Sequence, residues 1–443
     1  MATSKLGRSP ERRMELMFCD GDICKDAVRQ RVIGKHNQIV LSGPATGQVA
    51  YTWSQDSTTN NANGERSNVT RSSVLLLVRP NDENLIKKVA EVVPNLTHAG
   101  VKVLLVPDLA AKLKFYYGVD DERIGLFEAS MEFESRSSKT RHVNDSEDEW
   151  IEDVLIEPFP DLVCTLGGDG LLMHASMLFQ GPVPPIISIA GGSLGFLTPF
   201  KVENMEDAIC IALGMGNIEE TPDTDKRSTH DIPVFPPNME SYPFDNPLSQ
   251  ASHPKFSFGM DEYICMTIRM RLDCRIVSPE GVVRSRFNVL NEVVIDRGSS
   301  PYLAALECFC DDIHLTTVQA DGVIFATPTG STAYSMAAGG SVVHPAVPSI
   351  LVTPICPHVL SFRSMVFPDH VVLRCYVPDD ARATASVAFD GKHRRELQRG
   401  DSVQIQMSNY PVPTLNRGDH SSDWLEGLKR SFNFNTRPRQ RPL

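Results

Sequence analysis

The stretch Asp161-Leu162-Val163-Cys164-Thr165-Leu166-Gly167-Gly168-Asp169-Gly170 decides how this chain is interpreted. Residues Asp161–Leu166 have the composition of a buried strand, and a helical pattern begins after Gly170. A glycine-rich turn from strand to helix presents backbone N–H groups, and the helix N-terminus favours anions. Glycines also let a phosphate approach the main chain closely. The stretch therefore predicts a phosphate site at the carboxyl edge of a sheet.

Asp169 is unexpected at a site that only binds anions, because a carboxylate repels phosphate. It makes chemical sense if the site removes a proton from a hydroxyl or holds a metal ion beside phosphate. The alternative is an ordinary tight turn, since glycine and aspartate both favour turns. The other motifs of the chain must decide between the two.

Composition bounds the class of protein. A chain of 443 residues with 41% hydrophobic and 22% charged residues is typical of a globular protein with about two or three domains. The longest apolar stretches, such as Val74–Val78 and Val101–Val106, have the length of strands and predict no membrane span. A net charge of −12 argues against nucleic acid as the main partner. A small anion can still bind a local positive pocket.

The ten cysteines do not form a zinc-site pattern, because neither close pair, Cys19/Cys24 or Cys308/Cys310, has a matching second pair. We therefore expect free thiols and no metal-ligating set of protein residues. The first residues lack the apolar core of a signal peptide, and their acids argue against a transit peptide. We expect a cytoplasmic protein.

The N-terminal half divides into a tail and an α/β domain. Residues 1–72 are polar and poorly patterned, and we predict a disordered tail. Residues 73–215 alternate buried strands with helices, which predicts a Rossmann-like parallel sheet that binds a nucleotide. An acidic insert near 134–153 is expected to be solvated. The helix that begins at Pro80–Glu83 is expected to kink or end at Pro94.

The C-terminal half predicts an all-β domain. Residues 216–260 are rich in Pro, Ser, Asn and Asp, which indicates a linker or insert. Residues 261–420 predict a β-sandwich, with strands at 263–277, 287–296, 302–311, 314–327, 370–378, 383–390 and 402–408. Residues 421–443 predict a C-terminal helix that packs back on the first domain, and a tail. The expected fold is an α/β domain followed by a β-sandwich, with a ligand cleft between them.

Three more motifs carry polar chemistry. Gly191–Phe196 is a second glycine-rich turn after a strand. Asn291-Glu292 interrupts an apolar strand and suits ribose hydroxyls, although a surface pair beside a kink is the alternative. Asp321–Ser335 runs from a strand into a turn of hydroxyls and glycine; it lacks the lysine of a Walker A loop and the acid of a capping box. Phe389–Lys392 is, in isolation, an Asp-Gly hairpin.

Together and in this order, these motifs resemble the NAD kinases (ATP:NAD 2′-phosphotransferases), and closely the eukaryotic cytosolic type. The resemblance covers about residues 73–432 outside the acidic and proline-rich inserts. The matching stretches are Leu166–Gly170, Gly192–Phe200, Leu290–Gly298, Thr316–Ser335, Val343–Pro345, Leu351–Phe362, Phe389–Lys392 and Ser422–Glu426.

The resemblance implies that the γ-phosphoryl group of ATP moves to the 2′-hydroxyl of the adenosine ribose of NAD. Asp169 resembles the general base of the family. The backbone of Gly167, Gly168 and Gly170 would hold phosphates of ATP. The residues that resemble NAD-binding positions are Asp169, Gly170, Asn291, Glu292, Asp321, Thr332, Ala333 and Tyr334. Within this set, Asp321 would lie near the nicotinamide, and Thr332–Tyr334 would line the adenine pocket.

The resemblance also implies partners. Mg²⁺ would arrive with ATP rather than in a protein cage, and ATP and NAD would be the substrates. A homo-oligomer is implied in which a neighbouring subunit helps to complete the site. No nucleic acid or membrane is expected.

Two positions depart from the family pattern. Leu171 stands where the family commonly has Thr, and Ala320 stands where Gly is frequent. Leu171 keeps open the alternative of a catalytically weak dinucleotide sensor, whereas the retained Asp169 argues against it. A lipid kinase that shares the Gly-Gly-Asp-Gly turn is the other alternative, and it should lack Asn291-Glu292.

Histidines complete the candidates. His174, His344 and His358 are interpreted as structural, and His393 is a candidate for the nicotinamide side of the site.

Overall fold

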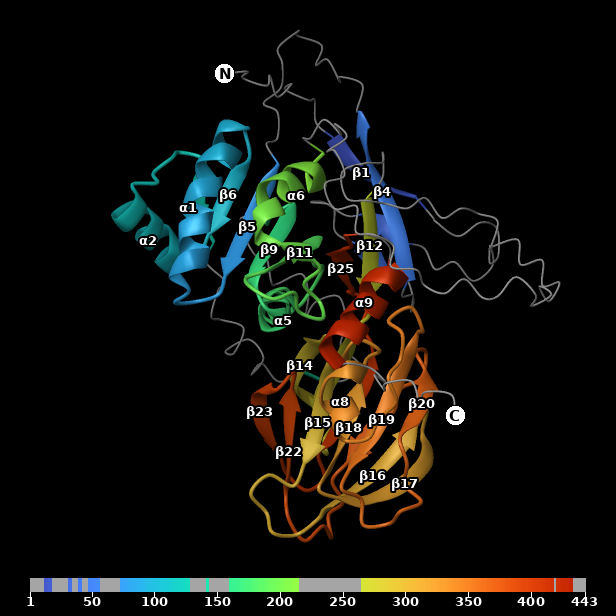
Figure 1. The fold of residues 1–443 in the computed structure, drawn as a ribbon. Helices are drawn as coiled ribbons and strands as arrows, with labels where there is room; N and C mark the ends of the chain where they lie inside the picture. The colour runs from blue at the N-terminus through green and yellow to red at the C-terminus, as the bar shows by residue number, and fades with distance from the viewer. Residues whose placement is uncertain are drawn as a thin grey trace, which may run out of the picture.

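The computed structural model describes residues 72–127, 159–214, 264–417 and 420–432, and the backbone of strands at 12–17, 31–33, 39–41, 47–55 and 141–142. The chain forms an α/β lobe and a β lobe, and helix α9 (His420–Phe432) lies where they meet (Figure 1). No helix within these ranges is long and apolar enough to span a membrane.

The α/β lobe is built on a ten-stranded mixed sheet. Its parallel part runs in the order β25-β10-β9-β5-β6-β7. The strands are β25 (Val412–Leu415), β10 (Ile186–Ala190), β9 (Leu162–Gly167), β5 (Ser73–Val78), β6 (Lys102–Leu105) and β7 (Ile124–Leu126), with the short β11 (Phe200–Lys201) beside β10. β5, β9 and β10 are almost uniformly apolar, because helices cover both faces of a parallel sheet.

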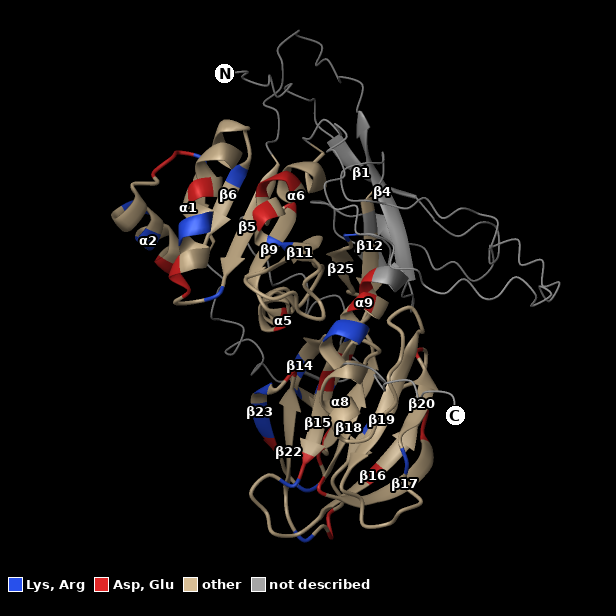
Figure 2. Cartoon of the chain, in the orientation of Figure 1, with Lys and Arg blue, Asp and Glu red and all other residues tan. Residues whose placement is uncertain are grey.

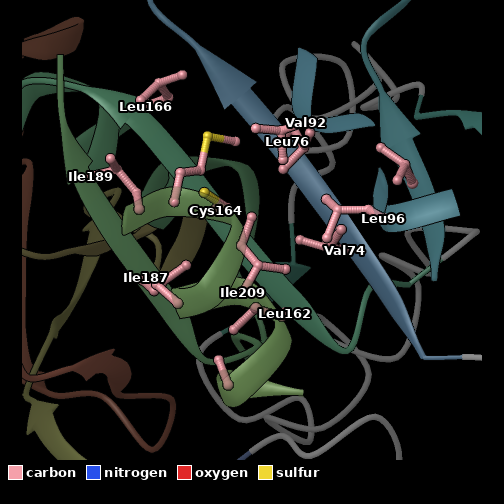
Figure 3. Close-up of a cluster of buried hydrophobic side chains, with 14 of the residues drawn as sticks. Val74, Leu76, Val92, Leu96, Leu162, Cys164, Leu166, Ile187, Ile189 and Ile209 are labelled. Carbon is pink, nitrogen blue, oxygen red and sulfur yellow. The ribbon is translucent and has the colours of Figure 1, made fainter. Parts of the chain in front are cut away.

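Alternate residues of β5 face the two apolar cores of this lobe. Val74 and Leu76 lie in the larger core, which α1 (Glu83–His98), α2 (Pro107–Tyr117) and α6 (Met205–Ala212) cover. Figure 3 shows part of it, with Val92 and Leu96 of α1 against β5. Leu75 and Leu77 point to the opposite core, which α5 (Asp169–Leu178) closes with Leu172 and Ala175. The Gly167–Gly170 turn thus leads into α5, the helix that covers the Leu75 and Leu77 face of the sheet.

Helix α1 begins as its sequence predicts and runs through Pro94. The Asp82 carboxylate accepts a hydrogen bond from the Leu85 N–H at 3.3 Å, which caps the helix. The helix continues past Pro94 to His98, so of the two outcomes predicted at Pro94, a kink or an end, the end does not occur. Pro94 lacks the N–H that would bond one turn back. Val93 and Leu96, both with no exposed surface, hold the last turn against the sheet.

The boundary between the lobes differs from the prediction. The expected strand 263–277 is two strands, β12 (Ile264–Arg269) and β13 (Leu272–Val277), and they belong to different lobes. β12 and β25 extend the sheet of the α/β lobe, although both lie inside the predicted sandwich domain 261–420. Period-two alternation cannot reveal this, because it continues through Met270-Arg271 while the chain changes sheets.

Residues 1–72, predicted to be a disordered tail, contain strands in the structure. β4 (Gly47–Gln55) pairs antiparallel with β12, and β1 (Arg12–Met17) pairs with β4. β2 (Arg31–Ile33) and β3 (Ile39–Leu41) form a separate two-stranded sheet. The open edge of β12 supplies a partner that local sequence does not show. The predicted linker at 216–260, most of the acidic insert and the end of the chain lie outside the described residues.

The β lobe is a sandwich, as predicted. One sheet has the order β17-β16-β21-β24-β13-β14-β8, and the other has the order β20-β19-β18-β15-β22-β23. Phe287 of the first sheet stacks on Phe389 of the second, with ring centroids 4.4 Å apart. The strands of the first sheet are β17 (Ile313–Ala320), β16 (Ala304–Cys310), β21 (Leu373–Tyr376), β24 (Ser402–Met407), β13, β14 (Val282–Val289) and β8 (Arg141–His142). Those of the second are β20 (Met365–Pro368), β19 (Ser349–Ile355), β18 (Gly322–Ala326), β15 (Glu292–Asp296), β22 (Ala385–Phe389) and β23 (Lys392–Leu397).

Helix α9 packs back on the α/β lobe, as expected, and also touches the β lobe. The Arg430 guanidinium donates to the Gly195 carbonyl oxygen at 2.7 Å, and the Phe432 ring lies 5.9 Å from the Phe196 ring. At the other end, the Trp424 ring meets His344 at 4.8 Å. The helix therefore bridges the second glycine-rich turn and the β lobe.

Charge is distributed unevenly over the described surface. Figure 2 shows acidic residues on α6 and basic residues along β23, at an edge of the β lobe. The net charge of the chain therefore does not describe the local field at any one site.

Candidate active site

The Asp169 side chain is held by the second glycine-rich turn. It begins helix α5, directly after the carboxyl end of β9. Its carboxylate accepts hydrogen bonds from the backbone N–H groups of Phe196 and Leu197, both at 2.9 Å. A Cβ atom at Gly195 would lie 2.4 Å from Asp169 Oδ1, so only glycine fits this approach. The two glycine-rich turns thus form one structure that fixes the direction of a carboxylate.

The turn before Asp169 leaves its backbone open. Nothing lies within 4 Å of a Cβ atom built at Gly168 or Gly170. Open space over main-chain N–H groups at a helix start is what a phosphate requires. Gly167 is tighter, because the Leu171 side chain lies 3.3 Å from its Cβ position.

Leu171 has a packing role at this point. It is half-buried and lies against the core that α5 closes. Leu171 thus places an apolar contact over Gly167 where the family resemblance predicts a hydroxyl.

Asn291 and Glu292 carry buried polar atoms that the described part of the chain leaves unpaired. Asn291 Oδ1 and Glu292 Oε2 have no hydrogen-bond partner there. Burial raises the pKa of Glu292 to about 8, and the nearby Asp390 carboxylate adds to this. Buried polar atoms are almost always paired, so two adjacent unpaired atoms indicate a ligand. The alternative of a surface pair beside a kink does not fit a side chain with 8% of its surface exposed.

Asp390 holds the Asn291-Glu292 backbone, a role that its sequence did not reveal. Its carboxylate accepts hydrogen bonds from the backbone N–H groups of Leu290, Asn291 and Glu292 at 2.8, 2.8 and 3.1 Å. Burial raises the pKa of Asp390 to about 6, although these N–H groups and Arg271 act in the opposite direction. The Asp-Gly pair is also a left-handed hairpin turn, with φ of 46° at Asp390. A local pattern typical of any hairpin gives no signal for the bonds to residues far away in the chain.

The Asp321–Ser335 motif packs against Asn291. The Thr327 N–H donates to the Asn291 carbonyl oxygen at 2.9 Å, and a Cβ atom at Gly330 would lie 2.1 Å from that oxygen. The turn then continues through the 3₁₀ turn Gly330–Thr332 into α8 (Tyr334–Ala337). Thr332, Ala333 and Tyr334 therefore lie in the turn that contacts the Asn291-Glu292 pair, with 45% of the Tyr334 surface exposed.

Asp321 is not brought to this cluster within one chain. Glu292 pairs with Ala326 and Asp296 pairs with Gly322, so Asp321 lies at the far end of β18. Five steps along the strand, from Asp321 to Ala326 opposite Glu292, span about 17 Å. The Asp321 carboxylate accepts from Arg297 Nε at 2.8 Å.

Polar contacts join α5 to the strand that leads to Asn291. Asn288 of β14 donates its N–H to Gln180 Oε1 at 2.7 Å, just beyond the end of α5. The Arg271 guanidinium donates to the carbonyl oxygens of Ser176, Phe179, Gly181 and Tyr410. The helix that carries Asp169 is therefore fixed to the β lobe. These contacts were not predicted; the signal for them in the sequence was two arginines, Arg269 and Arg271, at alternate positions of an apolar run.

The histidines are set mainly by packing. His393 stacks on Phe287 with ring centroids 5.2 Å apart, and burial lowers the pKa values of His174 and His344. The backbone N–H of His358 donates to the Gln319 carbonyl oxygen at 2.9 Å. The proposed role of His393 beside nicotinamide stays a prediction.

Comparison with known families matches both lobes. The ATP-NAD kinase N-terminal domain matches residues 74–211, and the ATP-NAD kinase C-terminal domain matches residues 290–417. Together they cover more than half of the chain.

Individual relatives agree. The chain is 45% identical over 284 residues to "NAD kinase 2, chloroplastic" of Arabidopsis thaliana, covering 64% of this chain and 25% of the relative. It is 38% identical over 294 residues to the NAD(+) kinase of Saccharomyces cerevisiae, covering 66% and 49%. The chain thus spans a quarter to about half of the length of these relatives.

A solved structure shares the fold. Yeast NADH kinase complexed with NADH superposes with a TM-score of 0.62 at 22% identity, covering 90% of this chain and 97% of that chain. The fold, the motifs of both lobes and the matched families lead to one conclusion: the chain belongs to the ATP-NAD kinase family.

Proposed function

We propose that this chain is an NAD kinase, which transfers the γ-phosphoryl group of ATP to the 2′-hydroxyl of the adenosine ribose of NAD. The observation that carries the proposal is the Asp169 carboxylate, held by two backbone N–H groups beside an open glycine turn. The family assignment over both lobes does not favour a lipid kinase or a non-catalytic sensor.

In this reaction, Asp169 accepts the proton of the 2′-hydroxyl. The ribose oxygen forms a bond to the γ-phosphorus, the bond from that phosphorus to its bridging oxygen breaks, and the electron pair leaves with ADP. Phosphoryl transfer asks for alignment and charge neutralisation more than covalent chemistry. A positioned general base typically contributes about 10² to 10⁴ in rate. The bonds from Phe196 and Leu197 supply that positioning.

The dinucleotide would bind mainly to residues of the β lobe. The unpaired oxygens of Asn291 and Glu292 would bind ribose hydroxyls of NAD. Thr332, Ala333 and Tyr334, in the turn packed on Asn291, would line the adenine pocket. The glycine backbone at 167, 168 and 170 would hold phosphates.

Asp321 would act in the site of another copy. Its place at the far end of β18 keeps it from its own Asn291-Glu292 pair. We propose a homo-oligomer in which Asp321 reaches the nicotinamide end of a dinucleotide bound mainly by a neighbouring subunit.

Mg²⁺ would enter with ATP. Within the described ranges, no group of three or more His, Cys, Asp or Glu side chains could hold a metal ion. The acid nearest to the proposed transfer, Asp169, spends both carboxylate oxygens on backbone N–H groups, which suits an ion bound chiefly by phosphate oxygens. When bound, the ion offsets phosphate charge. The cytoplasmic location stays a proposal, which fractionation of cells would test.

The test of the proposal is NADP formation by the purified chain with magnesium-ATP and NAD, detected with an NADP-specific dehydrogenase. Product that requires both substrates supports the proposal. NAD binding without product would establish the sensor alternative, and the absence of both would remove the dinucleotide assignment.

A further inference from the structure

Two buried arginines, Arg269 and Arg271, are separated by one residue and have different surroundings. Arg271 is fully buried, and its guanidinium donates to four backbone carbonyl oxygens. Arg269 has 9% of its surface exposed and donates only to two hydroxyls, Thr414 Oγ1 at 3.0 Å and Thr329 Oγ1 at 3.4 Å. Within the described residues, no salt bridge joins Arg269 to a carboxylate, and its side-chain partners are neutral hydroxyls. Arg271 is therefore fixed by backbone carbonyl oxygens, whereas the side chain of Arg269 contacts only neutral hydroxyls.

A buried cation without an anion is unfavourable, because it has lost its water without gaining a counter-charge. Burial lowers the pKa of Arg269 to about 10, an effect that the charges of Asp169 and Asp423 partly offset. The guanidinium therefore remains charged near neutral pH. The surroundings supply donors and hydroxyls but no ion pair, which is the environment expected of an unoccupied anion site.

The position of Arg269 indicates which anion it binds. Its Nη1 atom contacts Thr329, in the β-lobe turn that packs on Asn291, and its charge interacts with Asp169 of the α/β lobe, the lobe to which β12 itself belongs. β12, which ends at Arg269, pairs with β25 in the sheet whose β9 leads to Asp169. Arg269 thus contacts the Thr329 turn and lies within electrostatic range of Asp169, the carboxylate at the proposed transfer.

We propose that Arg269 binds the phosphoryl group during transfer and, afterwards, the 2′-phosphate of NADP. This inference rests on the proposed function, because it assigns a residue to the group that the reaction moves. A guanidinium suits this role, since its fork of N–H donors matches phosphate oxygens and neutralises their charge. Phosphate on ATP, on NADP or in the dinucleotide bridge shares this chemistry, and binding measurements can separate these sources.

The test compares the affinities of NAD and NADP for the wild type, Arg269→Met and Arg269→Lys by calorimetry without ATP. We expect Arg269→Met to weaken NADP binding by about 10- to 100-fold more than NAD binding, because only NADP carries the 2′-phosphate. Arg269→Lys should recover part of this difference, since the charge is kept and the fork is lost. ATP and ADP form a second arm, in which only ATP should lose affinity.

Thr414→Val is the matched control, because it removes a neutral partner of Arg269 and leaves the cation. It should change the ratio of NADP to NAD affinity by less than about threefold. Equal losses of NAD and NADP affinity in Arg269→Met would overturn the proposal in favour of a bridge-phosphate or packing role, and no loss would overturn it as well. If Arg269→Met does not fold, the lysine variant decides by the same ratio.

These outcomes are separate from the proposed function. A wild type that binds NADP through Arg269 but makes none would contradict the kinase activity and leave the phosphate site standing. If the wild type makes NADP but the Arg269 variants keep the wild-type ratio of NADP to NAD affinity, the kinase activity is supported and the phosphate site is contradicted.

Discussion

Asp169-Gly170 and Asp390-Gly391 are the same dipeptide after a buried strand, yet they do opposite things. In the α/β lobe, backbone N–H groups of a separate turn hold the Asp169 carboxylate beside an open glycine turn. In the β lobe, the buried Asp390 carboxylate itself holds three consecutive N–H groups at the start of the Asn291-Glu292 pair. The first carboxylate is positioned by the fold, and the second positions the fold.

The difference between the two lies in what surrounds them. Asp169 begins a helix, where open space meets main-chain N–H groups. Asp390 lies just beyond the end of β22, where burial raises its pKa and its three hydrogen-bond donors are backbone N–H groups, with the Arg271 charge nearby. We therefore expect changes at Asp169 to alter chemistry and changes at Asp390 to alter the site through its scaffold.

Asp169→Asn should produce the largest loss of activity. The amide keeps the size of the side chain but cannot accept the 2′-hydroxyl proton. We expect NADP formation to fall by at least about 100-fold, with NAD affinity changed much less. Steady-state rates together with calorimetry measure this, and equal rates for variant and wild type would contradict the role of base.

Asp390→Asn should have the second-largest effect. One amide oxygen replaces two charged acceptors, and an NH₂ group faces backbone donors. We expect about 2–4 kcal/mol lower unfolding free energy and an NAD affinity reduced by about tenfold or more. Denaturant unfolding and calorimetry measure both. A stable variant with normal NAD binding would show that the hydrogen bonds from Leu290, Asn291 and Glu292 to the Asp390 carboxylate are dispensable.

Glu292→Gln should weaken NAD binding and should increase the stability of the ligand-free protein relative to the wild type as the pH rises. The folded pKa of about 8 lies above the usual value of 4.5, so between these limits the folded state keeps a proton that the unfolded state has lost. This contribution to stability is complete below pH 4.5 and is lost as the pH rises through about 8.

The stability of Glu292→Gln relative to the wild type should therefore rise with pH across this window in the ligand-free protein, while NAD binding weakens. Thermal unfolding at several pH values tests the first part. A stability difference that does not change with pH would contradict burial of this carboxyl.

Leu171→Thr should have the smallest effect. The change introduces the hydroxyl that the family resemblance predicts and removes an apolar contact over Gly167. We expect about 1 kcal/mol lower stability and a turnover within about tenfold of the wild type. A much larger gain in turnover would mean that Leu171 limits the reaction.

The sequence predicted the parts of the site that local pattern encodes. The strand, glycine turn and helix around Asp169, the polar break at Asn291-Glu292 and the hydroxyl-rich turn at 327–334 all follow from residue type and spacing. The sandwich and the returning helix α9 were predicted in the same way and are confirmed.

The missed features all depend on contacts between distant parts of the chain. β12 and β25 leave the predicted sandwich for the other sheet, and β4 pairs with β12. Arg271, Asn288 and Asp390 act through backbone groups far away in sequence. Such partners are set by topology, so residue type shows only that a buried polar group needs a partner.

The most direct measurement is of NADP formation and unfolding free energy on the same preparations of wild type, Asp169→Asn and Asp390→Asn. The account predicts that Asp169→Asn loses at least about 100-fold in rate while its unfolding free energy falls by only about 1 kcal/mol. It predicts that Asp390→Asn loses stability first and activity with it. A catalytically active Asp169→Asn, or an inactive Asp390→Asn of unchanged stability and NAD affinity, would contradict the assignment of chemistry to one Asp-Gly pair and scaffold to the other.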